Sequence, residues 1–374
     1  MPRRLRLGMV GGGQGAFIGA VHRIAARLDD RWELVAGAFS SDPARGRASA
    51  DTFHVAPDRA YDDFAEMAAR EAAREDRVDA VAIVTPNHLH AQAATAFVER
   101  GIAVICDKPM THRLEDALAL AALVERRGVP FLLTHNYTGY PLVRQAREMV
   151  LAGALGTIRV VQVEYPQEWL TTRLEDSGHR QAAWRTDPAQ SGEAGCLGDI
   201  GTHAFNLAEF VTSLRCERVA ADLSAFVPGR RVDDNAHMLL RFAGGARGML
   251  WSSQVAPGNE NGLRLRVYGE AGGLEWAQEQ PNQLVYSPYG EAPRVIRRAG
   301  AGATQASRIP AGHPEGYLEA FAQLYRDFAD RLETGAEGDA PLPGVAEGVR
   351  GLRFIAAGLA STRADSRWAD VGGP

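Results

Sequence analysis

The pattern of hydrophobic and polar positions divides the chain into two parts, and the change falls near residue 138. In the first part, short apolar runs alternate with segments of helical composition and period. The apolar runs predict strands at 4–10, 32–39, 78–85, 102–109 and 130–136, and the intervening segments predict helices at 20–28, 64–75, 91–101 and 116–128. Because strands and helices alternate, this part predicts a doubly wound parallel sheet with both faces covered.

In the second part, apolar and polar residues alternate with a period of two, and glycines stand at the turns. The alternating stretches are 157–165, 218–227, 235–245, 246–255 and 263–276. This pattern predicts an α+β domain whose open, mostly antiparallel sheet has one covered face. A helix is predicted at 140–153, and the Gly-, Ala- and Pro-rich segment 287–312 predicts a loop.

Two helices are predicted after this loop. The helix at 317–332 carries one apolar stripe, made of Tyr317, Phe321, Leu324, Phe328 and Leu332. The stripe predicts a buried face, although Tyr317 at its start is also a candidate for the site. The helix at 345–360 could pack back on the first domain. We therefore predict an α/β protein with two domains, 1–138 and 139–374.

Composition and charge exclude several classes of protein. The 374 residues are 45% apolar and 23% charged, with a net charge of −5 and no long basic run, so neither nucleic acid nor an anionic membrane is the expected partner. Three cysteines, Cys106, Cys196 and Cys216, lack metal-type spacing and are too few for a disulfide framework, so no metal site is predicted. The N-terminal segment has arginines but no long apolar region, which predicts a cytoplasmic protein.

A glycine-rich turn, VGGGQGAFIGAVH, follows the first predicted strand and precedes the first helix. Glycines at such a turn let the backbone approach a pyrophosphate, and the following helix N-terminus attracts its charge. The spacing Gly11-x-Gly13-x-x-Ala16 satisfies a relaxed dinucleotide motif, whereas use of Gly19 would require three extra residues. The predicted cofactor contacts are Gly11, Gly13, Gln14, Gly15, Phe17 and Ile18. The alternative is a flexible turn without a ligand.

The end of the second strand normally distinguishes NAD from NADP. An acid there holds the ribose hydroxyls of NAD, and an arginine favours the extra phosphate of NADP. This chain has Ser40 at the expected acid position, followed by Ser41, with Arg45 nearby. Asp42 is instead a candidate cap of the next helix. We predict NAD, and NADP remains the alternative.

Four short motifs carry a resemblance to a known family. They are TPNHLH (85–90), CDKPM (106–110), GDIGTH (198–203) and HPEGYLEAF (313–321). In their order and separation they resemble the Gfo/Idh/MocA family of sugar and cyclitol oxidoreductases, over nearly the whole chain. The resemblance implies a Rossmann domain that binds a nicotinamide cofactor and a second domain that carries the substrate site and often the oligomer contacts. Two features depart from the family: Asp107 replaces its usual glutamate, and the glycine loop is longer.

The resemblance implies that Lys108, Asp199 and His203 are the catalytic residues. Oxidation of a secondary alcohol requires a hydride to leave the carbon and a proton to leave the hydroxyl. An imidazole, with an ordinary pKa of about 6.5, suits the base, so His203 is the predicted proton acceptor. Asp199 lies four residues earlier and can bind a neighbouring hydroxyl or orient the imidazole, while Lys108 can stabilise an alkoxide. The alternative is that Asp199 caps a helix and His203 is a packed histidine.

Further site residues are predicted around these three. By resemblance, the cofactor contacts also include Thr85, Asn87, His90, Asp107, Lys108, Asn136 and Trp184, and the substrate contacts include Lys108, Tyr137, Gln167, Arg185, Asp199 and His203. The alternatives are helix caps at 85–90, a simple domain crossover at 136–137, and a surface loop with a packing tryptophan at 184–185. His22 and His237 are expected to be structural, and His135 and His179 are expected to lie outside the site.

We predict an NAD(P)-dependent oxidoreductase that acts on a secondary hydroxyl of a cyclitol, sugar or sugar derivative, and an inositol dehydrogenase-like enzyme within the family. One alternative is an enzyme that keeps NAD bound and uses transient oxidation to cleave a glycoside or epimerise a sugar. Another is a nucleotide sensor without catalysis. The edge strands and the apolar outer face of the predicted sheet favour a homodimer or homotetramer.

Overall fold

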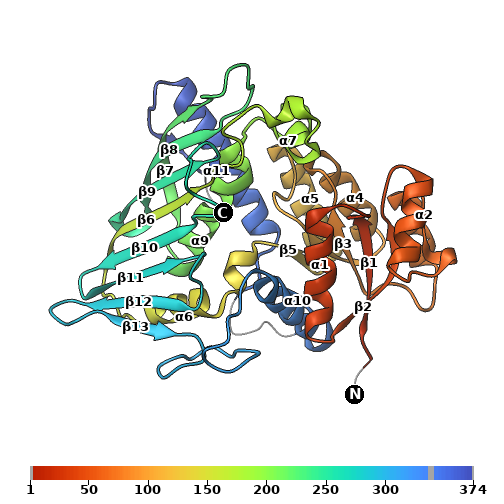
Figure 1. Cartoon of the computed structure of the whole chain (residues 1–374), viewed down its shortest axis with the longest axis horizontal. Coiled ribbons are helices and arrows are strands. Elements are labelled where there is room, and N and C mark those ends of the chain that lie inside the picture. The colour runs from red at the N-terminus through yellow and green to blue at the C-terminus, as the bar shows by residue number, and fades with distance from the viewer. Residues whose placement is uncertain (1–2, 336–340, 373–374) are drawn as a thin grey trace. The chain divides into compact units, whose positions relative to one another are not determined.

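The computed structural model describes residues 3–335 and 341–372 of the chain. They form two compact units (Figure 1). Unit 1 comprises Met1–Asn136 and Leu318–Val349, and unit 2 comprises Tyr137–Tyr317 and Arg350–Pro374.

Unit 1 is built on a five-stranded parallel sheet of order β2-β1-β3-β4-β5 (Figure 1). Its strands are β1 (Leu5–Gly11), β2 (Trp32–Ala38), β3 (Ala80–Val84), β4 (Ala103–Cys106) and β5 (Phe131–Leu133). Its helices are α1 (Phe17–Leu28), α2 (Pro43–Thr52), α3 (Phe64–Ala72), α4 (His90–Val98), α5 (Leu114–Arg127) and α10 (Tyr317–Thr334), of which all but Tyr317 belongs to this unit. Every residue of β3 is buried, as the predicted doubly wound sheet requires.

The strand order places a topological switch point between β1 and β3. In doubly wound sheets, ligands bind at the carboxyl ends of the strands beside such a point. Gly11 ends β1, Thr85 follows β3, and Asp107 and Lys108 follow β4. The fold therefore gathers the predicted cofactor residues of unit 1 at one edge of its sheet.

Helix α10 belongs to unit 1, which differs from the predicted boundary that assigned all of 139–374 to the second domain. The predicted apolar stripe is the reason. Tyr325 Oη lies 2.8 Å from His22 Nδ1, and Trp32 Nε1 donates a 2.9 Å hydrogen bond to the Tyr325 carbonyl. The Phe328 ring stacks on Trp32. These contacts bind α10 to α1 and β2. Helix α11 (Val345–Arg363) is the helix expected to return, and only its first residues, up to Val349, belong to unit 1.

Unit 2 is built on a nine-stranded sheet of order β13-β12-β11-β10-β6-β9-β8-β7-β14 (Figure 1). Its strands are β6 (Ile158–Pro166), β7 (Cys216–Ser224), β8 (Asn235–Phe242), β9 (Arg247–Ser253), β10 (Arg264–Gly269), β11 (Gly272–Ala277), β12 (Gln283–Pro288), β13 (Arg294–Arg297) and β14 (Ala369–Asp370). All neighbours are antiparallel except β6 and β9.

Helices cover one face of this sheet. They are α6 (Pro141–Leu151), α9 (Thr202–Thr212) and the part of α11 that belongs to unit 2, with the short α7 (Arg180–Arg185) and α8 (Pro188–Ser191) in the connection after β6. Helix α9 packs on β6, β9 and β10, and α6 packs on β11 and β12. The Phe354 ring of α11 stacks on Phe205 of α9 at 4.0 Å. The structure therefore has the predicted open sheet with one covered face.

The structure adds detail to the sequence prediction at three places. The stretch 263–276 is two strands, because the chain turns at 270–271 between β10 and β11. The segment 287–312 is not wholly a loop, since it contains β13, which pairs with β12. Helix α2 was not predicted because its apolar residues form no stripe, yet Asp42 caps it by accepting hydrogen bonds from the Ala44 and Arg45 amides.

Candidate active site

The glycine-rich turn between β1 and α1 has the backbone geometry of a phosphate-binding loop. Gly11, Gly12 and Gly15 have φ of 78°, 70° and 77°, which favour glycine. A Cβ on Gly13 would lie 2.9 Å from the Phe39 carbonyl oxygen. The first residues of α1 have no side-chain cap, so their amides are available to an anion.

Gly19 packs closely against the glycine turn, although its spacing in the dinucleotide motif is three residues too long. A Cβ at Gly19 would lie only 2.4 Å from the Gly12 Cα atom, so the turn can rest against α1 only because both positions lack side chains. Arg23 fixes the same turn from the helix by donating to the Gly12 carbonyl. The loop therefore holds extra residues between Gly13 and α1 without losing its contact with the helix.

The remaining predicted loop residues differ in their surroundings. The Gln14 amide donates to Ser49 Oγ, and its side chain donates to Thr52 Oγ1 on α2. Phe17 is 66% exposed and Ile18 is half-buried. After β2, the Ser40 hydroxyl accepts from the Asp42 amide, while Ser41 and Arg45 are exposed. The position after β2 where an acid would hold the ribose hydroxyls of NAD is therefore occupied by the hydroxyl of Ser40.

His90 supports the strand ends rather than facing a ligand directly. It is 1% exposed, and its two ring nitrogens lie 2.8 Å from the Pro109 and Thr85 carbonyl oxygens. Burial lowers its pKa. With both nitrogens against backbone, the ring fixes the ends of β3 and β4 to each other, which differs from the predicted direct cofactor contact.

Asp107 is held as a carboxylate at the end of β4. Burial opposes its ionisation, but His22, Lys108 and His90 lower its pKa to about 2. Thr134 Oγ1 donates to Asp107 Oδ1 at 2.8 Å. The next residue, Lys108, is half-buried. Its side chain therefore extends from the backbone directly after the anchored Asp107.

Two residues after β5 complete the edge of the sheet. His135 is buried, and burial together with Lys108 lowers its pKa to about 3. A base of that strength is poorly matched to neutral pH, so His135 is not suited to be the catalytic base. Asn136 is 1% exposed.

These residues of unit 1 fit a dinucleotide. Thr85 Oγ1 and Asn136 Nδ2 are buried polar atoms without a hydrogen-bond partner among the described residues, and such atoms are rare unless a ligand or water binds them. Thr85 and Asn136 both lie at the carboxyl edge of the sheet, as does the glycine turn. The buried Asn87 lies in the turn after Thr85.

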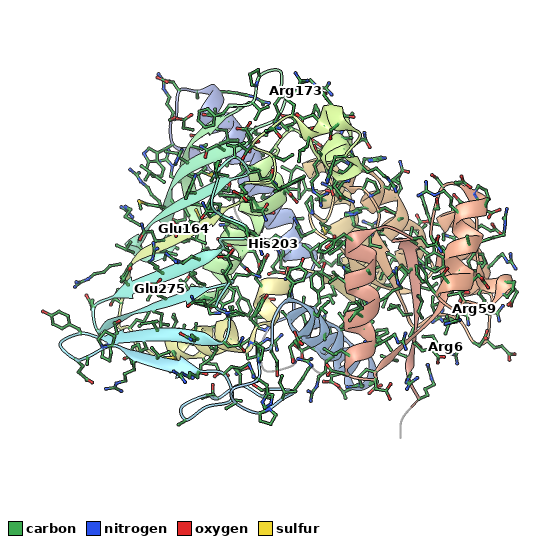
Figure 2. All side chains as sticks on the ribbon, in the orientation of Figure 1. Arg6, Arg59, Glu164, Arg173, His203 and Glu275 are labelled. Carbon is green, nitrogen blue, oxygen red and sulfur yellow. The ribbon has the colours of Figure 1, made fainter. Side chains whose placement is uncertain are left out.

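In unit 2, His203 lies in the first turn of α9 (Figure 2). It is 7% exposed, and its ring packs edge-to-face on Tyr137 with ring centroids 4.9 Å apart. The Tyr137 and Tyr165 hydroxyls share a short hydrogen bond. Burial raises the pKa of Tyr137 to about 12, so its hydroxyl keeps its proton at neutral pH. His203 therefore sits beside a hydroxyl network.

Asp199 lies in a π-helical turn, Leu197–Gly201, that runs directly into α9. Its Oδ2 atom accepts a 2.9 Å hydrogen bond from Gln254 Nε2 and lies 3.3 Å from Arg185 Nε. Asp199 is therefore held by side chains and does not cap the helix. The Arg185 guanidinium also lies over the Trp184 ring, 4.3 Å from its centroid. Trp184 is thus a neighbour of the acid in unit 2.

The glycines before α9 are explained by the approach of the segment preceding β8. A Cβ at Gly195 would lie 2.1 Å from the Asp233 carbonyl oxygen. The Asp233 carboxylate accepts hydrogen bonds from the Gly195 and Leu197 amides, at 2.7 and 2.8 Å. This buried acid fixes the start of the turn that carries Asp199.

Gln167 belongs to a hydrogen-bonded row at the end of β6. Its Nε2 atom donates to Asn261 Oδ1, and its Oε1 atom accepts from Trp169 Nε1. Tyr165 Oη also donates to Asn261 Oδ1, at 2.7 Å. Sequence reasoning missed Tyr165, Asn261 and Gln254, because each is distant in sequence from the motifs and lies in no motif of its own.

The described residues contain neither a metal-binding cluster nor a membrane-spanning helix. Within 3–335 and 341–372, no three His, Cys, Asp or Glu side chains are grouped so that they could hold a metal ion. No helix in these ranges combines the length and apolarity needed to cross a membrane.

Comparison with known proteins identifies the class of this chain. Residues 5–135 match the oxidoreductase family with an NAD-binding Rossmann fold, and residues 143–275 match the GFO/IDH/MocA C-terminal domain. Together with the five-stranded sheet and its glycine turn, these matches define an NAD-binding oxidoreductase of the sugar and polyol dehydrogenase type. The chain belongs to the Gfo/Idh/MocA family.

Similar proteins span the whole chain. The uncharacterized oxidoreductase YfiI of Bacillus subtilis is 32% identical, over 98% of this chain and 96% of that protein. An oxidoreductase structure from Sinorhizobium meliloti is 52% identical with a TM-score of 0.90, covering 98% of this chain and 99% of the other. An inositol dehydrogenase homolog from Azotobacter vinelandii, crystallised with NADH and myo-inositol, is 36% identical with a TM-score of 0.91, covering 99% and 98%.

Proposed function

We propose that the protein oxidises a secondary hydroxyl of a cyclitol, sugar or sugar derivative, with NAD as hydride acceptor and His203 as proton acceptor. The observation that carries this proposal is the arrangement on unit 2. An acid anchored by Arg185 and Gln254 stands one turn before a buried histidine, and that histidine contacts a tyrosine of a hydroxyl network. Such an array of donors and acceptors suits a substrate with several hydroxyls.

The residues have distinct proposed roles. His203 takes the hydroxyl proton, and Asp199 accepts a hydrogen bond from a neighbouring hydroxyl. The ammonium group of Lys108 stabilises negative charge on the substrate oxygen. NAD, when bound, supplies the acceptor for the hydride. The glycine turn with Thr85, Asn136 and Asp107 is the proposed holder of the cofactor.

The relatives support this substrate class. The Azotobacter protein, similar over almost the whole chain, was crystallised with a cyclitol and the reduced cofactor. An inositol 2-dehydrogenase-like activity is therefore the specific reaction to test first. A reaction that retains NAD and uses transient oxidation is the competing enzyme class.

The first test measures reduced-nicotinamide absorbance with NAD and NADP in parallel, against inositols, aldoses and glucosides at mildly alkaline pH. Stoichiometric reduction with one polyol is the expected result. Product formation while cofactor stays on the protein and no reduced cofactor accumulates would favour transient oxidation instead.

The His203→Ala variant tests the proton acceptor. We expect kcat to fall by about 10²- to 10⁴-fold, because general-base catalysis contributes that much, while NAD affinity is unchanged. NAD binding is measured by calorimetry, and the matched control is His237→Ala, whose ring stacks on Trp251 in the sheet. Full turnover by His203→Ala would show that this histidine is not the proton acceptor. If the variant loses both NAD binding and turnover, circular dichroism determines whether it is misfolded.

We also propose that the uncovered face of the nine-stranded sheet binds a second copy of the chain. Exposed apolar side chains lie on this face, on five of its strands. They are Val160, Leu239, Met249, Tyr268 and Val295. Glu164 and Glu275, seen on their strands in Figure 2, alternate with Arg264 and Arg266 in ion pairs on the same sheet. Mixed apolar and paired charged positions suit a self-complementary interface.

A further inference from the structure

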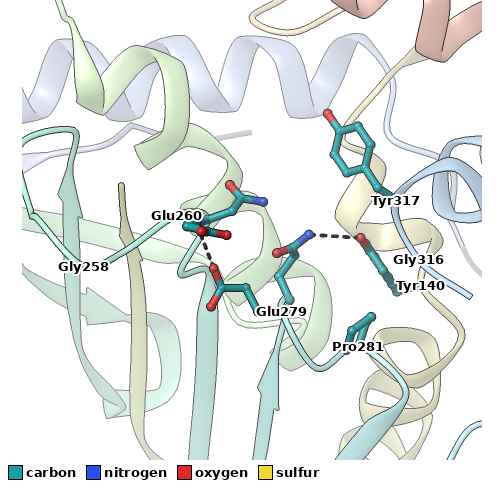
Figure 3. Close-up of a pocket in the computed structure, with 9 residues that line it drawn as sticks. Tyr140, Gly258, Glu260, Glu279, Pro281, Gly316 and Tyr317 are labelled. Atoms are coloured by element: carbon teal, nitrogen blue, oxygen red, sulfur yellow. Dashed lines mark hydrogen bonds between the residues drawn. The ribbon is translucent and has the colours of Figure 1, made fainter. Parts of the chain in front are cut away.

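Unit 2 contains a pocket that the proposed reaction does not use. Its volume is about 660 Å³, within the range of small-molecule sites. The residues that line it include Asn261, Gln278, Glu279 and Tyr317 (Figure 3). They come from the segment before β10, the segment after β11, and the start of α10.

Two side chains connect this pocket to the surroundings of His203. Asn261 lines the pocket, and its Oδ1 atom accepts from Tyr165, whose hydroxyl is bonded to that of Tyr137. Tyr317 also lines the pocket, and its ring centroid lies 6.4 Å from that of Tyr137. Tyr137 in turn packs on His203, so two side chains, Tyr317 and Tyr137, connect the pocket to the proposed base.

The lining has the composition of a carbohydrate site. It offers the amides of Asn261 and Gln278, the carboxylates of Glu260 and Glu279, and the ring of Tyr317. Amides and carboxylates bind sugar hydroxyls, and an aromatic ring packs against the apolar face of a sugar. The described lining residues include no Lys, Arg or His, so a phosphate or carboxylate group would meet only negative charge.

One side chain that lines the pocket has an acceptor without a partner. Gln278 Oε1 is buried and has no hydrogen-bond partner among the described residues. The Nε2 atom of the same amide points to Tyr140 Oη at a long 3.5 Å (Figure 3). A buried acceptor without a partner is costly in the free protein, and rotation of this weakly held amide into the pocket would let a ligand hydroxyl satisfy it.

We infer that the substrate is a glycoside whose second, uncharged sugar ring occupies this pocket while the ring to be oxidised lies at Asp199 and His203. This inference rests on the proposed function, because it takes the reacting ring to be a polyol beside His203. It narrows the substrate class: a free cyclitol or monosaccharide leaves the pocket unfilled, and the negative charges of Glu260 and Glu279 disfavour a phosphorylated glycoside.

The test compares kcat/KM for three matched substrates of the full-length protein. They are one polyol ring alone, the same ring carrying a glucosyl group, and the same ring carrying an amino group. We expect the glucosyl compound to exceed the free ring by about tenfold or more, since it satisfies polar groups that are otherwise unpaired. Equal values, or a gain confined to the amine, would overturn the assignment of an uncharged sugar ring.

The variant Gln278→Leu tests the pocket itself. It removes the buried acceptor and leaves an apolar side chain that is one heavy atom shorter, so the ratio of kcat/KM for the glycoside to that for the free ring should fall about tenfold. The control is Gln280→Leu, an exposed position two residues away that does not line the pocket, and it should leave the ratio unchanged. A ratio that is the same in both variants would overturn the inference.

Binding separates this inference from the proposed function. Turnover of the free ring without any gain for the glycoside refutes the pocket and leaves the dehydrogenase proposal standing. If no substrate is oxidised, calorimetric titration with the glucosyl compound still decides the matter: binding to wild type that is weakened in Gln278→Leu supports the pocket, and equal or absent binding refutes it.

Discussion

At the scale of single residues, hydrogen-bond partners and burial decide which titratable groups can take part in proton transfer. His90 has both ring nitrogens against carbonyl oxygens, and burial with Lys108 lowers the pKa of His135 to about 3. Neither ring is suited to exchange a proton with substrate near neutral pH. The motif GDIGTH already points to His203, and the surroundings of His90 and His135 explain why these two rings are poor alternatives to it.

The neutral state of His135 predicts a pH-dependent stability. Its pKa is about 3 in the folded protein and about 6.5 when unfolded, so between these values the unfolded chain binds more protons. The free energy of unfolding should therefore fall as the pH drops from about 6.5 towards 3, by up to about 1.4 kcal/mol per pH unit from this one residue. His135→Gln should remove that share of the slope.

The measurement is urea unfolding of wild type and His135→Gln at several pH values between 7 and 4. The control is His313→Gln, at an exposed position. Buried His90 contributes a slope of the same sign in all three proteins. Parallel pH profiles for wild type and His135→Gln would show that His135 is not held neutral by the fold.

At the scale of elements, close backbone contacts position the functional side chains. The glycine turn rests on α1 through Gly12 and Gly19, and the start of the π-helical turn rests on the segment before β8 through Gly195 and Asp233. In both places a glycine is required because a neighbouring backbone segment lies too close for a side chain, and not because a ligand approaches it. The Asp199 turn therefore depends on a residue outside the motif, since Asp233 fixes its first amides.

The Gly19→Ala variant tests the first of these contacts. The added methyl group would lie 2.4 Å from Gly12 Cα, so the turn must move away from α1. Overpacking of this kind costs about 1–3 kcal/mol, and we expect NAD affinity to fall about tenfold or more. Calorimetry with NAD measures this.

Gly46→Ala is the matched control in the neighbouring helix α2. Its new methyl group would meet no atom closer than 3.7 Å, and its backbone is helical. NAD affinity should be retained, and the melting temperature should rise slightly because alanine favours helix. Equal loss of NAD affinity in the two variants would mean that the turn does not depend on the Gly12–Gly19 contact.

At the scale of the whole molecule, the sheet of unit 2 is covered by helices on one face only. Leu239 and Met249 pair across β8 and β9 on the other face, and they are 51% and 44% exposed. Exposed apolar side chains that lie together on a sheet are typical of protein–protein contact. The proposed partner is a second copy of this chain.

Light scattering tests the proposed self-association. Wild type should have the mass of a dimer or tetramer, and Leu239→Asp should shift it towards the monomer, because a carboxylate would be buried without a partner. Phe226→Asp, at a 65% exposed position outside the strands, introduces the same charge and should leave the mass unchanged. A monomeric wild type, or an equal mass for wild type and Leu239→Asp, would contradict the interface.

The sequence by itself determined the features that depend on local periodicity and on contiguous motifs. Alternating apolar runs predicted the doubly wound sheet and the open sheet, because side-chain burial repeats with the period of each element. The motifs around Gly11, Lys108 and His203 identified the family, and the family matches confirmed it.

Only the tertiary structure decided which distant residues meet. It brought Gln254 to Asp199 and Asn261 to Gln167, and it placed α10 against His22 and Trp32 within unit 1. These contacts join residues far apart in sequence, so no local pattern encodes them. The pocket beside Tyr317 depends on three such segments and follows from their folding alone.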